Sequence, residues 1–160
     1  MTTQTSPRTE RTPATAPQVD IRGPRFAAWI TTAVLLAVLL ASAVSTVAAA
    51  VLLAAQAIVF AFGAVYGPRR HPYGLIFSRL VAPHLGPVTE REPVAPLRFA
   101  QLVGLVFALA GVAGFALGIP LAGVIATAFA LAAAFLNAAF GICLGCQIYP
   151  LVHRLRRRHI

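Results

Sequence analysis

The chain of 160 residues contains no lysine and only four acidic residues, so its positive charge comes from 13 arginines. Only 11% of the residues are charged and 59% are hydrophobic, whereas about a quarter of a typical soluble domain is charged. This composition excludes an ordinary soluble domain and leaves no room for a separate soluble catalytic domain. The arginines flank apolar segments instead of forming a continuous basic face with aromatic side chains, so nucleic-acid binding is not expected.

Charged residues are also missing from four long apolar stretches, which we place at about residues 26–44, 47–66, 99–117 and 121–145. About 20 apolar residues in a helix cross a hydrocarbon core of about 30 Å. Backbone groups in lipid must pair within their own segment, so each stretch is expected to be a helix. The predicted fold is therefore all-α, a four-helix transmembrane bundle over residues 21–155. Residues 1–20 are predicted to form a disordered tail, and residues 156–160 a basic tail.

The arginines occur in three segments only: before the first stretch, between the second and third, and after the fourth. The connections at residues 41–46 and 118–121 carry no charge. Positively charged loops remain cytoplasmic, so we expect a multi-pass protein of the bacterial inner membrane with both termini in the cytoplasm. Ala41-Ser42-Ala43 resembles a signal-peptidase site, but cleavage there would leave a chain that begins almost directly inside another apolar stretch.

The loop at residues 67–97 is predicted to contain a short helix that starts at Pro72 and ends at Pro83. Apolar side chains would place this helix on the membrane surface, beside Arg79; they are Leu75, Ile76, Phe77, Leu80 and Val81. The following segment, which contains Pro87, Pro93 and Pro96, is expected to be irregular.

An internal repeat relates the two halves of the chain. The pattern LAA, six residues, FG-x-x-x-G occurs at residues 53–67 and again at residues 131–145, and Arg25-Phe26-Ala27 matches Arg98-Phe99-Ala100. Each unit would be a helical hairpin, so the two copies would share one orientation and be related by an axis along the membrane normal.

Small residues are expected to hold the helices together, because lipid chains are as apolar as leucine and burial alone cannot drive association. Three Gly-x-x-x-Gly pairs are candidates for close helix packing: Gly63 and Gly67, Gly114 and Gly118, and Gly141 and Gly145. Three amides lie at membrane depth: Gln56, Gln101 and Asn137. Gln56 shares a helix face with Gly63 and should point into the bundle. The amides fit either interhelical hydrogen bonds or a substrate path.

Cys143 and Cys146 form the one chemical motif, at the cytoplasmic edge of the fourth stretch. Cysteines three apart on a helix are close enough for a disulfide, but cytoplasmic thiols make a permanent structural disulfide unexpected. The carboxyl end of a helix disfavours a thiolate, whereas the nearby arginines (Arg69, Arg70, Arg154) favour it, so the reactivity of the pair stays open.

Three roles for the cysteines compete. They form a redox or sulfur-handling dithiol, or they only pack as small apolar residues. A metal site, the third role, would use Cys143, Cys146, His153 and His159, whose spacing only loosely resembles a zinc site. No cofactor is expected, and whether the chain is an enzyme stays open. The main alternative to thiol chemistry is a small transport or scaffold subunit.

Three segments resemble a bacterial membrane family catalogued as domain of unknown function 4395. They are Arg98-Phe99-Ala100-Gln101, Pro72-Tyr73-Gly74-Leu75 and the run of residues 137–146, which ends in Cys143-Leu144-Gly145-Cys146. The resemblance implies a four-helix membrane protein with a Cys-x-x-Cys signature and a thioredoxin-like or sulfurtransferase partner in the cytosol. Many members carry an acidic residue after the second cysteine, where this chain has Gln147, so carboxylate-assisted thiol chemistry is not implied here.

Overall fold

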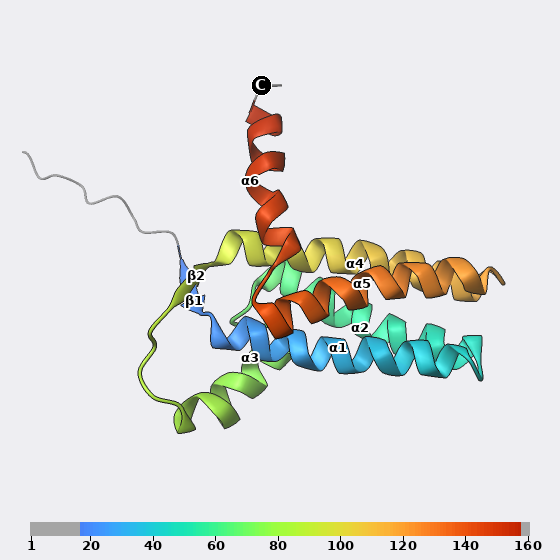
Figure 1. Cartoon of the computed structure of the whole chain (residues 1–160), viewed down its shortest axis with the longest axis horizontal. Coiled ribbons are helices and arrows are strands. Elements are labelled where there is room, and N and C mark those ends of the chain that lie inside the picture. The colour runs from blue at the N-terminus through green and yellow to red at the C-terminus, as the bar shows by residue number, and fades with distance from the viewer. Residues whose placement is uncertain (1–16, 158–160) are drawn as a thin grey trace, which may run out of the picture.

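The computed structural model describes residues 17–157 of the chain and shows a bundle of four long helices within that range (Figure 1). The helices of this bundle are α1 (Arg22–Ser42), α2 (Thr46–Tyr66), α4 (Val94–Ala116) and α5 (Pro120–Phe140). Each is long and apolar enough to cross a membrane. The predicted all-α, four-helix transmembrane bundle is therefore confirmed.

The shorter elements lie at one end of the bundle (Figure 1). They are α3 (Pro72–Ile76), the π-helix η1 (Phe77–Val81), the 3-10 helix η2 (Ala82–His84), α6 (Leu144–Arg157), and the strands β1 (Gln18–Asp20) and β2 (Arg91–Pro93). We call this end, which carries every arginine among the described residues, the arginine end. The tight, uncharged turns between α1 and α2 and between α4 and α5 lie at the opposite end.

The packing of the helices agrees with the internal repeat. Helix α2 packs against α4, and α5 packs against α1; these two interfaces correspond when the first hairpin is superposed on the second. Arg98 donates from Nε and Nη2 to the carbonyl oxygens of Ala64 and Val65, at 2.9 and 2.8 Å. Arg25 likewise donates from Nη2 to the carbonyls of Ala138 and Ala139, at 3.3 and 3.4 Å. Each arginine thus donates hydrogen bonds to carbonyl oxygens at the carboxyl end of a helix in the other hairpin, where these oxygens have no partner within the helix.

Close backbone approach holds the bundle together at several glycines. A Cβ on Gly114 would lie 2.5 Å from the backbone nitrogen of Gly123, so α4 and α5 touch there without side chains between them. A Cβ on Gly63 would lie 2.7 Å from His71 Cδ2 and 2.8 Å from Gln101 Cγ. A Cβ on Gly145 would lie 2.6 Å from Ala100 Cα. Gly114 and Gly145 therefore lie against backbone and leave no space for a side chain, whereas a side chain at Gly63 would require His71 and Gln101 to shift.

The other three glycines of the predicted pairs lie where helices end. Gly67, Gly118 and Gly141 have φ values of 78°, 74° and 70°, in the left-handed region that glycine adopts without strain. Within residues 17–157, no atom lies within 4 Å of a Cβ built on Gly118 or Gly141. Gly118 and Gly141 thus end helices and do not pack closely. Gly67 does both, since a Cβ there would lie 3.3 Å from Val94 Cγ1 on α4.

Several boundaries differ from the sequence prediction. Helix α4 begins at Val94 and not near residue 99, because Pro96 falls in the first turn, where its missing N–H removes no intrahelical hydrogen bond. The fourth span ends at Phe140 and does not reach residue 145. Residues 18–20, assigned to a disordered tail, form β1 and pair antiparallel with β2. Residues 156–157, assigned to a basic tail, belong to α6. The rest of the predicted amino-terminal tail, residues 1–16, lies outside the described residues.

Helix α6 leaves the bundle crosswise, roughly perpendicular to the long helices (Figure 1). Its apolar residues recur at helical spacing, as Leu144, Ile148, Leu151 and Val152, and these side chains are 38–60% exposed. Leu144 and Ile148 line a cavity of the bundle. With the bundle across a bilayer, α6 would lie along the membrane surface, with Leu151 and Val152 available to lipid and Arg154 near the headgroups. The cysteine pair at its start therefore lies close to the membrane–water boundary.

Candidate functional site

Helix α5 ends one turn earlier than its counterpart α2, and this early end creates the site. In the repeat, Gly63 corresponds to Gly141 and Gly67 to Gly145. In α2 the helix continues through Gly63 and ends at Gly67, whereas α5 ends at Gly141, whose N–H donates to Asn137 O at 3.0 Å. Cys143 therefore lies outside α5, in the short link between α5 and α6.

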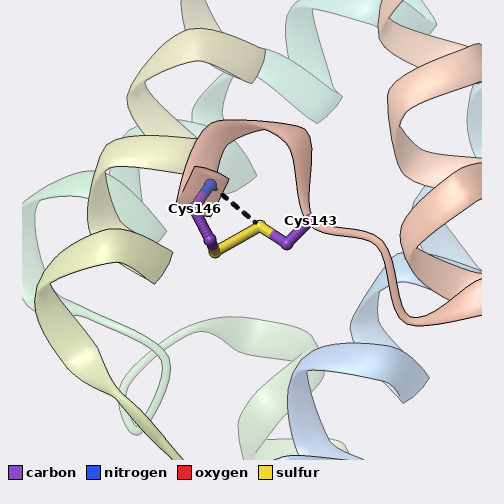
Figure 2. Close-up of a disulfide and its surroundings, with 2 residues drawn as sticks. All are labelled: Cys143 and Cys146. Carbon is purple, nitrogen blue, oxygen red and sulfur yellow. Dashed lines mark hydrogen bonds between the residues drawn. A yellow bond between two sulfur atoms is a disulfide. The ribbon is translucent and has the colours of Figure 1, made fainter. Parts of the chain in front are cut away.

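The structure joins Cys143 and Cys146 in a disulfide, with their Cα atoms 5.2 Å apart (Figure 2). Cys143 directly precedes α6, and its carbonyl oxygen accepts the N–H of Gln147 at 3.1 Å. Its Sγ accepts the backbone N–H of Cys146 at 3.3 Å, the dashed line in Figure 2. This is the hydrogen bond that a capping side chain makes at the amino end of a helix.

The position of Cys143 reverses one electrostatic expectation. The sequence places both cysteines at the carboxyl end of the fourth span, where the helix dipole opposes a thiolate. In the structure that helix has already ended at Phe140, and Cys143 lies instead at the amino end of α6. The amino end of a helix and a donated N–H both favour a negative sulfur, so the helix dipole does not oppose a thiolate at this position.

A cavity of about 600 Å³ opens beside the disulfide. Its wall includes Cys143 and Gly145 near α6, the amides Gln101 and Asn137 in the bundle, and Arg69 near the arginine end. Cavities of this size accommodate small organic molecules, and a mostly apolar wall with a few polar groups is typical of binding sites. Cys143 and the two amides thus line one cavity.

His71 is the most deeply buried ionisable group of this cavity. Its side chain is 2% exposed, and within residues 17–157 neither ring nitrogen has a hydrogen-bond partner. Burial lowers the pKa of His71 to about 4, so the ring is neutral at physiological pH. Its ring contacts that of Tyr73 edge to face, with centroids 5.2 Å apart. The side chain of Gln101 lies next to it, since both would collide with a Cβ on Gly63.

The two-stranded sheet and one ion pair cover the arginine end of the cavity. Gln18, Asp20 and Arg91, all from β1 and β2, contribute to its wall. Asp20 pairs with Arg22 at 2.8 Å, and this hydrogen-bonded guanidinium lowers the pKa of Asp20 below its usual value. Arg22 also donates to the carbonyl oxygen of Gly86 at 3.1 Å. These contacts hold the amino-terminal strand and the long loop together over the site.

The predicted polar residues fall into two groups. Gln101 and Asn137 line the cavity. Gln56 points into the bundle, as predicted, and is 1% exposed. Its Oε1 accepts the hydroxyl of Tyr73 at 2.8 Å, so its partner comes from α3 in the loop and not from another spanning helix.

No group of three or more His, Cys, Asp or Glu side chains able to hold a metal occurs in the part of the chain that the structure describes. The weak zinc alternative pairs Cys143 and Cys146 with His153 and His159. His159 lies outside the described residues, and the two sulfurs are bonded to each other. The side chain of His153 also lies outside the described part of the chain, so the structure describes only the two cysteines of this set.

Sequence reasoning missed His71. It stands in a polar loop, where histidine is usually solvated, and its burial depends on the absence of a side chain at Gly63, eight residues earlier. The available signal is its place directly before Pro72, because a proline that starts a helix fixes where the preceding residue points.

A comparison with known families assigns the chain to one of them. The family described as "Domain of unknown function (DUF4395)" matches residues 19–154. The chain belongs to the DUF4395 family. No curated protein and no solved structure matches it. The three segments that carry the resemblance to DUF4395 meet at the cavity, since Gly74, Gln101, Asn137 and Cys143 all line it.

The buried neutral His71 predicts a pH-dependent stability. The unfolded chain binds the proton near pH 6.5 and the folded protein only near pH 4. Above pH 6.5 the buried imidazole therefore does not lower the free energy of unfolding. Between pH 6.5 and 4 the free energy of unfolding falls by about 3 kcal/mol, because the unfolded chain takes up the proton and the folded protein does not. The free energy of unfolding in detergent should fall over this range more steeply for the native chain than for His71→Gln. Equal slopes for the two proteins would contradict the burial of a neutral imidazole.

Proposed function

We propose that this protein is a multi-pass protein of the bacterial inner membrane whose Cys143–Cys146 pair exchanges electrons or sulfur with a cytosolic protein. The observation that carries the proposal is the disulfide at the amino end of α6, at the arginine end of the bundle. A cytosolic thioredoxin-like protein or sulfurtransferase is the expected partner.

The charge distribution supports a cytoplasmic position for the pair. The turns between α1 and α2 and between α4 and α5 carry no charge, and the described arginines lie at the other end. Arginine-rich segments remain on the cytoplasmic side of a membrane. Both termini, the loop at residues 67–93 and the cysteine pair would then face the cytoplasm, where partner proteins with reactive thiols occur.

The chemistry of the pair follows from its geometry. In the reduced protein the Cys143 thiolate attacks a disulfide of the partner; a new S–S bond joins Cys143 to one partner sulfur, and the other leaves as a thiolate. Cys146 then attacks Cys143, which restores the intramolecular disulfide and releases the second partner thiol. The reverse sequence reduces the pair. Cys143 is the attacking nucleophile because the amino end of α6 and the N–H of Cys146 stabilise its thiolate.

Trapping the intermediate tests the proposal. In a Cys146→Ser variant the second step is missing, so a mixed disulfide between Cys143 and its partner should accumulate. Native membranes carrying this variant would be mixed with a thioredoxin-type protein that keeps only one active-site cysteine, activated as a mixed disulfide with thionitrobenzoate. Attack by Cys143 releases thionitrobenzoate, and the partner has no second thiol to reverse the step. The sample is then acid-quenched and run on a non-reducing gel. We expect a band at the summed mass that disappears on reduction.

The matched control is Cys143→Ser, which keeps the same number of thiols but removes the residue at the helix end. It should trap at least about tenfold less partner, because stabilising one thiolate by about 1.4 kcal/mol already gives that ratio. Equal trapping by both variants would contradict the assigned order of attack. No trapping by either one, together with thiols that resist alkylation under reducing conditions, would favour a transport or scaffold subunit in which the cysteines only pack.

A further inference from the structure

The cavity beside Cys143 extends deep into the membrane-spanning bundle. Leu97 and Phe107 both line it and lie ten residues apart on α4, which corresponds to about 15 Å along the helix axis. Its inner part is walled by the rings of Phe60, Phe107 and Phe129. A ligand there would have a flat or chain-like apolar body within the hydrocarbon region and a head near the cysteines.

The outer part of the cavity holds polar atoms that lack a partner. Across the described range 17–157, neither His71 nitrogen is hydrogen-bonded, nor is the buried Oε1 of Gln101. A neutral imidazole offers one donor and one acceptor, and the amide oxygen adds an acceptor. Buried polar atoms are almost always paired in native proteins. Three unpaired atoms on two neighbouring residues that line the cavity would therefore suit a group that both accepts and donates hydrogen bonds.

A redox couple with exchangeable protons fits these atoms. A quinone accepts hydrogen bonds at its two carbonyl oxygens, and the corresponding quinol donates them from two hydroxyls. The donor of His71 serves the oxidised form, whereas the acceptors of His71 and Gln101 serve the reduced form. Quinones are soluble in the membrane, so such a ligand reaches the bundle through lipid without passing the sheet and loop that cover the arginine end.

We propose that this cavity binds a lipid-soluble quinone, which oxidises the reduced Cys143–Cys146 pair. The inference rests on the proposed thiol exchange, which supplies the reduced pair. Two S–H bonds break and one S–S bond forms; the two electrons and two protons released convert the two quinone carbonyls to hydroxyls. The net reaction carries a cytosolic dithiol's electrons into the membrane quinone pool.

The experiment uses the full chain in nanodiscs made from quinone-free synthetic lipid. The pair is reduced with dithiothreitol, the reductant is removed, and decyl-ubiquinone is added without oxygen. Quinol is followed by its ultraviolet absorbance, and the disulfide by the mass of alkylated protein. We expect one quinol for each disulfide formed, and a rate about tenfold lower in Gln101→Leu, which loses a hydrogen bond to the head.

Two controls separate binding from chemistry. Gln147→Leu makes the same change at an exposed position on α6 and should leave the rate unchanged. In the Cys143→Ser/Cys146→Ser protein, which cannot transfer electrons, an azido-quinone should label peptides that contain His71 or Gln101, and decyl-ubiquinone should compete with it.

The outcomes distinguish the two proposals. If Cys143 exchanges with the thioredoxin-type protein but the quinone neither labels the cavity nor reoxidises the pair, the quinone inference is overturned and the thiol exchange stands; the polar atoms then hold water only. If the quinone labels the cavity but the pair reacts with neither quinone nor protein, the proposed function fails and the redox step with it. Quinol formation that Gln101→Leu does not slow also overturns the assigned site.

Discussion

A Gly114→Leu protein is expected to have a clearly less stable bundle. The Cβ alone would lie 2.5 Å from the backbone nitrogen of Gly123 and 2.9 Å from its Cα. Backbone atoms cannot rotate away as a side chain does, so α4 and α5 must separate. Overpacking in a well-packed core costs about 1–3 kcal/mol, and a clash with backbone should fall at or above the upper end. Leucine favours helix over glycine by about 1 kcal/mol, which offsets only part of this cost.

The matched control is Ala110→Leu, which adds a side chain to the exposed face of the same helix, one turn away. Unfolding in detergent, followed by circular dichroism, should show a lower midpoint for Gly114→Leu and an unchanged one for Ala110→Leu. If both variants unfold like the native chain, the contact between α4 and α5 at Gly114 and Gly123 is not what holds the second hairpin together.

The spanning helices could be predicted from the sequence because lipid imposes one strong rule on them. About 20 uncharged residues are needed for each crossing, and the backbone leaves only the helix as a solution. The interior position of Gln56 also followed from helical periodicity, as its burial at 1% exposure confirms. Such features depend on residues that are close together in the sequence, so they can be predicted from local sequence patterns.

The site depends on a structural difference between the two copies of the repeat, although their sequences match at the glycines concerned. Gly63 and Gly141 occupy equivalent positions, yet one is a buried helix residue and the other ends a helix. A glycine permits both conformations, so the choice is made by tertiary contacts: His71 and Gln101 pack over Gly63, whereas no described atom approaches a Cβ built on Gly141. Local sequence could therefore predict the cysteine pair but not its place at the start of α6. The cavity wall could not be predicted either, because its residues come from segments far apart in the sequence, between Gln18 and Ile148.

The reduced cysteines are expected to react with a labelling reagent from one side of the membrane only. Because α6 starts at the arginine end, both sulfurs should meet water on the cytoplasmic side once the disulfide is reduced. A membrane-impermeant maleimide should then modify reduced protein in inside-out vesicles and leave it unmodified in right-side-out vesicles. The two single Cys→Ser variants assign the label, and Cys143 should react at lower pH than Cys146, because the helix end stabilises its thiolate.

This labelling is the most direct test of the central claim, that an early end of α5 delivers a reactive Cys143 to the cytoplasmic surface. The claim predicts rapid modification of reduced Cys143 from the inner side alone, with Cys146 following at higher pH. Modification only from the outer side, or sulfurs that stay inaccessible from both sides after reduction, would contradict it.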